Sequence, residues 1–165
     1  MSAKPSAEQP VETRFAPSLD VNGDQVLELE IPPRRDYLAV ARQLVAAVNV
    51  DARLDPLRLS NLQLAVSEAC TNAIAAHELI GVPDTIAIRA AASPARVEVV
   101  IRDHGGGFDP SQAVALPDPE DPRRLDYEHG LGLGIMRALA DQLEIHTTHS
   151  GTAVRLVMLT TAPSP

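Results

Sequence analysis

The sequence is poor in aromatic residues. Phe, Tyr and Trp make up 2% of its 165 residues, and tryptophan is absent. A hydrophobic core must therefore be built from Ala, Val, Leu and Ile, and an apolar content of 45% is enough to supply it. The length allows one domain with a sizeable core and leaves little room for a second.

Cysteine is almost absent as well. Cys70 is the single cysteine in the sequence, which excludes a disulfide framework or a thiolate metal cluster within one chain. Because Cys70 falls inside a helical pattern, its simplest interpretation is a small core residue. A reactive thiol is the alternative.

Basic residues and long apolar runs are also scarce. The 14 Lys and Arg residues are outnumbered by 22 Asp and Glu, which gives a net charge of −8. This balance argues against direct binding to nucleic acid or to an anionic membrane, but it is compatible with a protein partner or a nucleotide chelated to Mg²⁺. No run approaches the roughly 20 apolar residues of a membrane span, and no signal-peptide pattern opens the sequence. We therefore expect a soluble cytoplasmic protein.

Hydrophobic periodicity predicts one domain over residues 25–160, preceded by a mobile N-terminal arm (1–24) and followed by a loose tail (161–165). A Pro-rich, acidic stretch near 108–129 is long for a connection and is predicted to be a lid. The order of elements predicts an α+β fold, a two-layer sandwich of a mixed, largely antiparallel sheet with helices on one face. Strands are predicted at 26–31, 85–90, 97–102, 143–148 and 153–159, and helices at 35–50, 56–79 and 131–141.

The longest predicted helix carries two polar residues at the edge of its apolar stripe. Glu68 and Asn72 lie one turn apart and so share a face. Glu68 could accept the proton of an attacking hydroxyl or water, and Asn72 could supply a neutral oxygen ligand to Mg²⁺. For this pair alone, a solvated carboxylate and amide on the helix rim is the alternative.

Two glycine-rich stretches could complete a nucleotide site. Asp103 ends a strand, where its carboxylate could accept a hydrogen bond from an amine such as adenine N6, and the glycines that follow permit close backbone approach. A simple strand-ending turn is the alternative. The second stretch opens the helix predicted at 131–141, where free N–H groups and the helix dipole favour a phosphate, although tight packing would also explain glycine there. The glycines are Gly105 and Gly107 in the first stretch, and Gly130, Gly132 and Gly134 in the second.

In order and spacing, these segments resemble the boxes of the Bergerat-fold ATPases. The matching segments are Glu68-x-x-x-Asn72, Asp103-x-Gly105-x-Gly107-Phe108, Gly130-Leu131-Gly132-Leu133-Gly134 and Gly151-Thr152. The stretch from Ala65 to Ala73 looks like the bacterial anti-sigma-factor serine kinases in particular, and the resemblance covers residues 26–159. It implies that Glu68 is the catalytic base, Asn72 the Mg²⁺ ligand, Asp103 the adenine reader and Thr152 a neighbour of the adenine, with the five glycines also binding ATP.

The resemblance further implies an activity and partners. Such kinases use ATP and Mg²⁺ to phosphorylate a serine on a small antagonist (anti-anti-sigma) protein, alternate this with sequestration of a sigma factor, and form homodimers. One alternative is a nucleotide-gated binding module of a partner-switching pathway with little kinase activity. Another is a kinase in a different signalling switch, such as a stress or cell-division pathway.

The sequence departs from the family pattern at two places. The family usually has a histidine four residues after the asparagine, whereas here Ala76 holds that position and His77 follows. Either the helix is distorted there, or the role of that histidine is absent. Some members also have an arginine just before the glycine-rich helix, for which Arg123 and Arg124 of the lid are candidate substitutes. The histidines show no recurring metal-ligand spacing and are interpreted as scattered surface residues.

Overall fold

A computed structural model describes residues 13–20, 23–81, 84–106 and 128–161, with the side chains of 128–131 left aside. Each strand and helix predicted from the periodicity is present, with its ends moved by a few residues. In chain order the elements are β1 (Arg14–Leu19), β2 (Gln25–Ile31), the 3-10 helix η1 (Arg35–Tyr37), α1 (Leu38–Ala52), α2 (Pro56–Ile80), β3 (Ile86–Ser93), β4 (Arg96–Arg102), α3 (Glu128–Leu139), β5 (Gln142–Thr148) and β6 (Gly151–Leu159).

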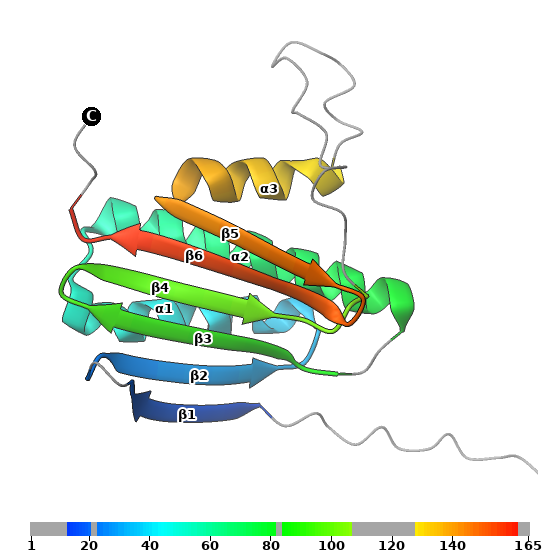
Figure 1. Ribbon diagram of the computed structural model, residues 1–165, viewed down its shortest axis with the longest axis horizontal. Helices are drawn as coiled ribbons and strands as arrows, with labels where there is room; N and C mark the ends of the chain where they lie inside the picture. The colour runs from blue at the N-terminus through cyan, green and yellow to red at the C-terminus, as the bar shows by residue number, and fades with distance from the viewer. Residues whose placement is uncertain (1–12, 21–22, 82–83, 107–127, 162–165) are drawn as a thin grey trace, which may run out of the picture.

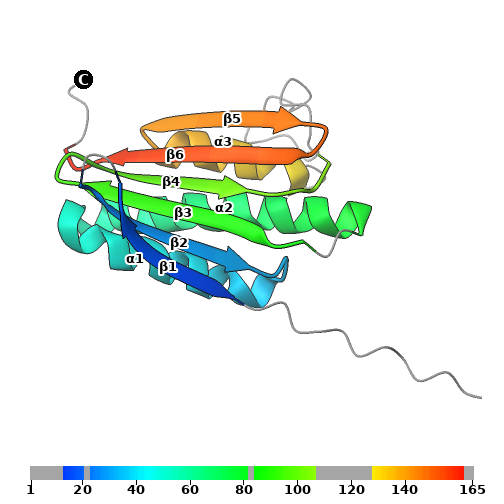
Figure 2. The same cartoon turned by 60° about the horizontal axis from the view of Figure 1, so that its bottom comes forward.

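The strands form one sheet in the order β1-β2-β3-β4-β6-β5, and the helices cover one of its faces (Figures 1 and 2). Helix α1 packs on β2 and β3, while α2 lies between α1 and α3 and packs on β4 and β6. This arrangement is the predicted α+β sandwich. Every pairing among the described strands is antiparallel, so the mixed pairing that the prediction allowed is not found among them.

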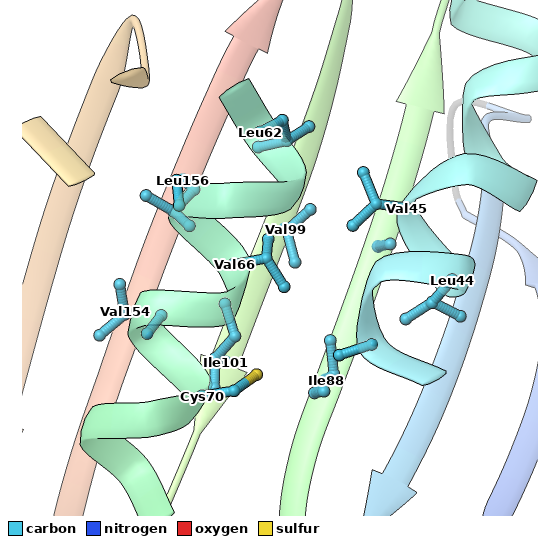
Figure 3. Close-up of a cluster of buried hydrophobic side chains, with 14 of the residues drawn as sticks. Leu44, Val45, Leu62, Val66, Cys70, Ile88, Val99, Ile101, Val154 and Leu156 are labelled. Carbon is cyan, nitrogen blue, oxygen red and sulfur yellow. The ribbon is translucent and has the colours of Figure 1, made fainter. Parts of the chain in front are cut away.

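The core between sheet and helices is aliphatic, as the scarcity of aromatic residues requires. Alternate residues of each central strand point toward the helices and meet the apolar stripes of α1 and α2 (Figure 3). Residues that are at most 2% exposed in this contact include Leu62, Val66 and Cys70 of α2, Ile88 of β3, Val99 and Ile101 of β4, and Leu156 of β6.

Helix α2 has the start that its sequence predicts. The Asp55 carboxylate accepts hydrogen bonds from the main-chain N–H groups of Leu57 and Arg58, at 2.9 and 3.0 Å, and Pro56 occupies the first helical position. The helix ends at Ile80 and is capped by Gly81, whose positive φ of 67° suits glycine. One continuous helix, from Pro56 to Ile80, therefore carries both Glu68 and Asn72.

Cys70 is a small core residue, as predicted, and its burial raises the pKa of the thiol from 9.0 to about 12. Because the thiolate is the nucleophile, we expect native protein to react with iodoacetamide at neutral pH roughly 1,000-fold more slowly than free cysteine. The rate can be followed by mass spectrometry, with urea-unfolded protein as the control. Since the folded-state pKa is the higher one, the matching stabilisation is present below pH 9.0 and is lost as the pH rises toward 12. Alkylation of the native protein at the free-cysteine rate would contradict this burial.

The predicted N-terminal arm requires a correction, because part of it is an edge strand. Strand β1 pairs with β2 in antiparallel register from Arg14 opposite Glu30 to Leu19 opposite Gln25. All six β1 side chains are exposed, so no face is buried and no apolar alternation marks the strand in the sequence. Residues 1–12 lie outside the described residues. So does most of the predicted lid, but Glu128 and His129, placed at its end, belong to α3.

The face of the sheet opposite the helices carries charged side chains. Arg155 of β6 donates to Glu98 of β4 at 2.7 Å and to Glu144 of β5 at 2.9 Å, and the hydrogen bond to Glu98 raises the pKa of Arg155. These cross-strand pairs tie the three strands together on the exposed side. Within the described part of the chain, no helix is both long and apolar enough to cross a membrane.

Candidate active site

Two polar residues continue the inward-facing rows of neighbouring strands. Asp103 follows Val99 and Ile101 in the period of β4, and Thr152 precedes Val154 in the period of β6, so both side chains face the helix layer. Asp103 is 8% exposed and Thr152 is 6% exposed. The Asp103 N–H donates to the Thr152 carbonyl oxygen at 2.9 Å. The resemblance placed both residues near the adenine, and the sheet brings them side by side.

The carboxylate of Asp103 is held in one orientation. Its Oδ1 accepts hydrogen bonds from the main-chain N–H groups of Gly105 at 2.8 Å and of Thr152 at 3.3 Å. Among the described residues, no hydrogen bond ends on Oδ2. This oxygen can therefore accept a hydrogen bond from a ligand, as an adenine amino group would require.

Thr147 extends the polar row and was missed by the sequence interpretation. Its hydroxyl lies 3.3 Å from that of Thr152 on the adjacent strand. The available signal was its position in β5, where Leu143, Ile145 and Thr147 alternate on the inward face. The polar row thus consists of Asp103 after β4, Thr152 of β6 and Thr147 of β5.

The loop after β4 lies directly on α2. A Cβ atom on Gly105 would be 2.4 Å from the Cβ of Ala76, far inside van der Waals contact, so glycine is required for this approach. This close approach places the loop that follows Asp103 against α2, and the role of Gly105 as a wall of the site stays a prediction. Gly107 and Phe108 lie outside the described residues.

Glu68 and Asn72 converge on the start of α3. A Cβ atom on Gly132 would lie 3.2 Å from Oε2 of Glu68 and 3.3 Å from both amide atoms of Asn72. Glu68 is half-buried and Asn72 is exposed. A carboxylate and an amide oxygen in one place suit a hard cation such as Mg²⁺ together with phosphate oxygens.

The predicted role of the α3 glycines needs adjustment, because the helix begins at Glu128 rather than near residue 131. Only the first four N–H groups of a helix lack an intrahelical partner. Gly130 is among them, whereas Gly132 and Gly134 come later. The absence of a side chain at Gly132 instead leaves room for Glu68 and Asn72.

Replacing Gly132 with alanine should separate stability from activity. We expect unchanged or slightly higher stability, by up to about 1 kcal/mol, because alanine favours a helix. Phosphoryl transfer, the activity that the family resemblance implies, should fall by about tenfold, since the new methyl group displaces Glu68 and Asn72. Thermal unfolding and turnover would be measured together, with Ala138→Gly on the exposed side of α3 as the control. Full activity in a folded Gly132→Ala protein would contradict the close approach of Glu68 and Asn72 to Gly132.

His77 is not a surface residue, which corrects the sequence interpretation. It is 1% exposed, and its Nε2 atom accepts a hydrogen bond from the main-chain N–H of His104 at 3.1 Å. Helix α2 continues without interruption to Ile80, so no distortion returns His77 to the position that Ala76 occupies. The side chains of His104, His146 and His149 are exposed, as predicted. Arg123 and Arg124 lie outside the described residues.

The chain belongs to the family of histidine kinase-like ATPase domains, whose sequence profile matches residues 31–158. Membership implies ATP binding. The chain is also similar to serine-protein kinases. It is 30% identical to serine-protein kinase RsbW of Bacillus subtilis (strain 168) over 138 residues, which cover 82% of this chain and 86% of the relative. The same kinase of Bacillus pumilus (strain SAFR-032) is 31% identical over 136 residues, covering 79% and 83%. The predicted resemblance to serine kinases is thereby confirmed.

Proposed function

We propose that this protein is an ATP- and Mg²⁺-dependent serine protein kinase that acts as an anti-sigma factor in the cytoplasm. It phosphorylates a small antagonist (anti-anti-sigma) protein, sequesters a sigma factor and works as a homodimer. The convergence of Glu68 and Asn72 on Gly132 carries the proposal, because it puts a base and an oxygen ligand together in an ATPase fold. The similarity to proteins named serine-protein kinases supports serine as the residue that accepts the phosphoryl group.

Glu68 accepts the proton of the substrate serine hydroxyl as the serine oxygen attacks the γ-phosphorus of ATP. The bond between that phosphorus and the bridging oxygen breaks, and ADP leaves with the electron pair. Asn72 would hold Mg²⁺ through its side-chain oxygen, and the bound metal would offset phosphate charge. One residue thus acts on the nucleophile and the other on the metal.

Asp103 and Thr152 select the base at the other end of the site. Oδ2 of Asp103 accepts a hydrogen bond from the adenine amino group, while Oδ1 stays bound to the main chain. Thr152 lies against the same carboxylate and borders the adenine. Gly105 lets the loop that carries Asp103 pack on α2, and Gly132 leaves room for Glu68 and Asn72. Gly107, Gly130 and Gly134 are proposed as further contacts of the nucleotide.

A pull-down from the native host with ATP labelled on the γ-phosphate tests the proposal. Tagged protein, its co-eluting partners and Mg²⁺ are incubated with labelled ATP, and the label is traced to protein and residue. Label on a serine of a small co-eluting protein is the expected result. A retained sigma factor with no label, although the antagonist is present, would instead favour a nucleotide-gated binding module.

A further inference from the structure

The loop after β4 contacts α2 at two consecutive residues, Ala76 and His77. A Cβ atom added to Gly105 would lie 2.4 Å from the Cβ atom of Ala76, and His77 is the next residue of the helix. The imidazole of His77 is 1% exposed, and its Nε2 accepts the His104 N–H at 3.1 Å. One residue supplies space for the loop, and the next supplies a hydrogen-bond acceptor.

This attachment is adjacent to the proposed adenine reader. Asp103, the residue before His104, is bound through Oδ1 to the N–H of Gly105, the residue after it. The Asp103 carboxylate thus closes a turn over residues 103–105, and the hydrogen bond from the His104 N–H to His77 fixes this turn to α2. A shift of the His104 main chain would move the carboxylate with it.

The same helix also carries the proposed base and metal ligand. On α2, Glu68 lies about two and a half turns and Asn72 about one and a half turns before His77, so the phosphate end and the adenine end of the site rest on one rigid element. Only an unprotonated Nε2 can accept the His104 N–H, so the imidazole in this contact is neutral and carries its hydrogen on Nδ1.

We propose that His77 is a positioning residue that fixes the Asp103 loop relative to α2 and so sets the affinity and selectivity for the adenine base. The inference rests on the proposed ATP site. It assigns His77 a role through Asp103, not contact with the nucleotide. Loss of the acceptor should weaken ATP binding and raise the KM for ATP more than it lowers kcat, because the base and the metal ligand stay in place.

The test compares three variants of the full chain. His77→Leu removes the acceptor, His77→Gln keeps an oxygen that can replace Nε2, and His104→Ala removes an exposed side chain but keeps the main-chain donor. For His77→Leu we expect ATP binding by calorimetry to weaken about tenfold, as for a buried N–H left unpaired. His77→Gln and His104→Ala should stay within about threefold of wild type, a smaller cost than that unpaired group. Equal ATP affinity in folded His77→Leu, or equal loss in His77→Leu and His77→Gln, would overturn the inference.

Amide hydrogen exchange at His104 provides a readout that needs no nucleotide. The His104 N–H should be protected in wild type and in His77→Gln, and exposed in His77→Leu. An unprotected amide in the wild-type protein would overturn the inference even if ATP binds. Absence of ATP binding by a wild-type protein whose His104 amide is protected would count against the proposed function, while the attachment of the loop would stand.

Discussion

Replacing Glu68 with glutamine is expected to lower the rate of serine phosphorylation by about 100- to 10,000-fold, the range for loss of a general base. Glutamine has nearly the same shape but cannot accept the serine proton. Because the proposed adenine contacts, Asp103 and Thr152, lie at the other end of the site, ATP affinity should change little. Turnover with a phosphoacceptor protein and calorimetric binding of ATP would be measured on the same preparation.

Asn72→Asp serves as the matched comparison for this variant, since it keeps an oxygen at the same place on α2 and leaves Glu68 intact. It should retain more transfer activity than Glu68→Gln and show a changed dependence on Mg²⁺ concentration. Unchanged transfer by Glu68→Gln would exclude Glu68 as the base. A parallel loss of ATP binding would show that the residue holds the nucleotide instead.

Replacing Gly151 with alanine should cost the most stability of any single change considered. Gly151 begins β6 with φ of +139°, and a Cβ atom there would lie 1.9 Å from the carbonyl oxygen of Asp103. The neighbouring main chain would have to move, because no side chain can rotate away. We expect a loss of about 3 kcal/mol in the free energy of unfolding, at the upper end for overpacking, together with weaker ATP binding.

Chemical denaturation compares Gly151→Ala with Gly81→Ala. Gly81 also has a positive φ, of 67°, but no atom lies within 4 Å of the added Cβ. Its substitution should therefore cost only the backbone strain, about 1 to 2 kcal/mol. Equal effects of the two changes would mean that the close approach of Gly151 to Asp103 does not exist in solution.

The sequence predicted those parts of the molecule whose pattern is local. Apolar alternation located every strand with a buried face, and helical spacing placed Glu68 and Asn72 together. Strand β1 was missed because neither of its faces is buried, so main-chain pairing with β2 leaves no trace in its side chains. The start of α3 was placed too late for a related reason, since its first turn follows a stretch without periodicity.

Contacts between distant segments could not be predicted from periodicity alone. Asp103 and Thr152 are neighbours only because β4 pairs with β6 rather than with the next strand in sequence. Periodicity shows which side of α2 carries His77, but it does not show that the loop after β4 covers that side. His77 was therefore assigned to the surface. The family resemblance placed Asp103 and Thr152 near the same adenine, and it gave no role for His77 in this register.

Calorimetric titration with ATP and with GTP in the presence of Mg²⁺, on wild type and Asp103→Asn, tests the central claim that the described residues form one adenine nucleotide site. Wild type should bind ATP at least about tenfold more tightly than GTP, as expected when a hydrogen bond to a charged group is lost. Asp103→Asn should lose most of this preference while remaining folded. No binding of ATP, or equal binding of both nucleotides that Asp103→Asn leaves unchanged, would contradict the claim.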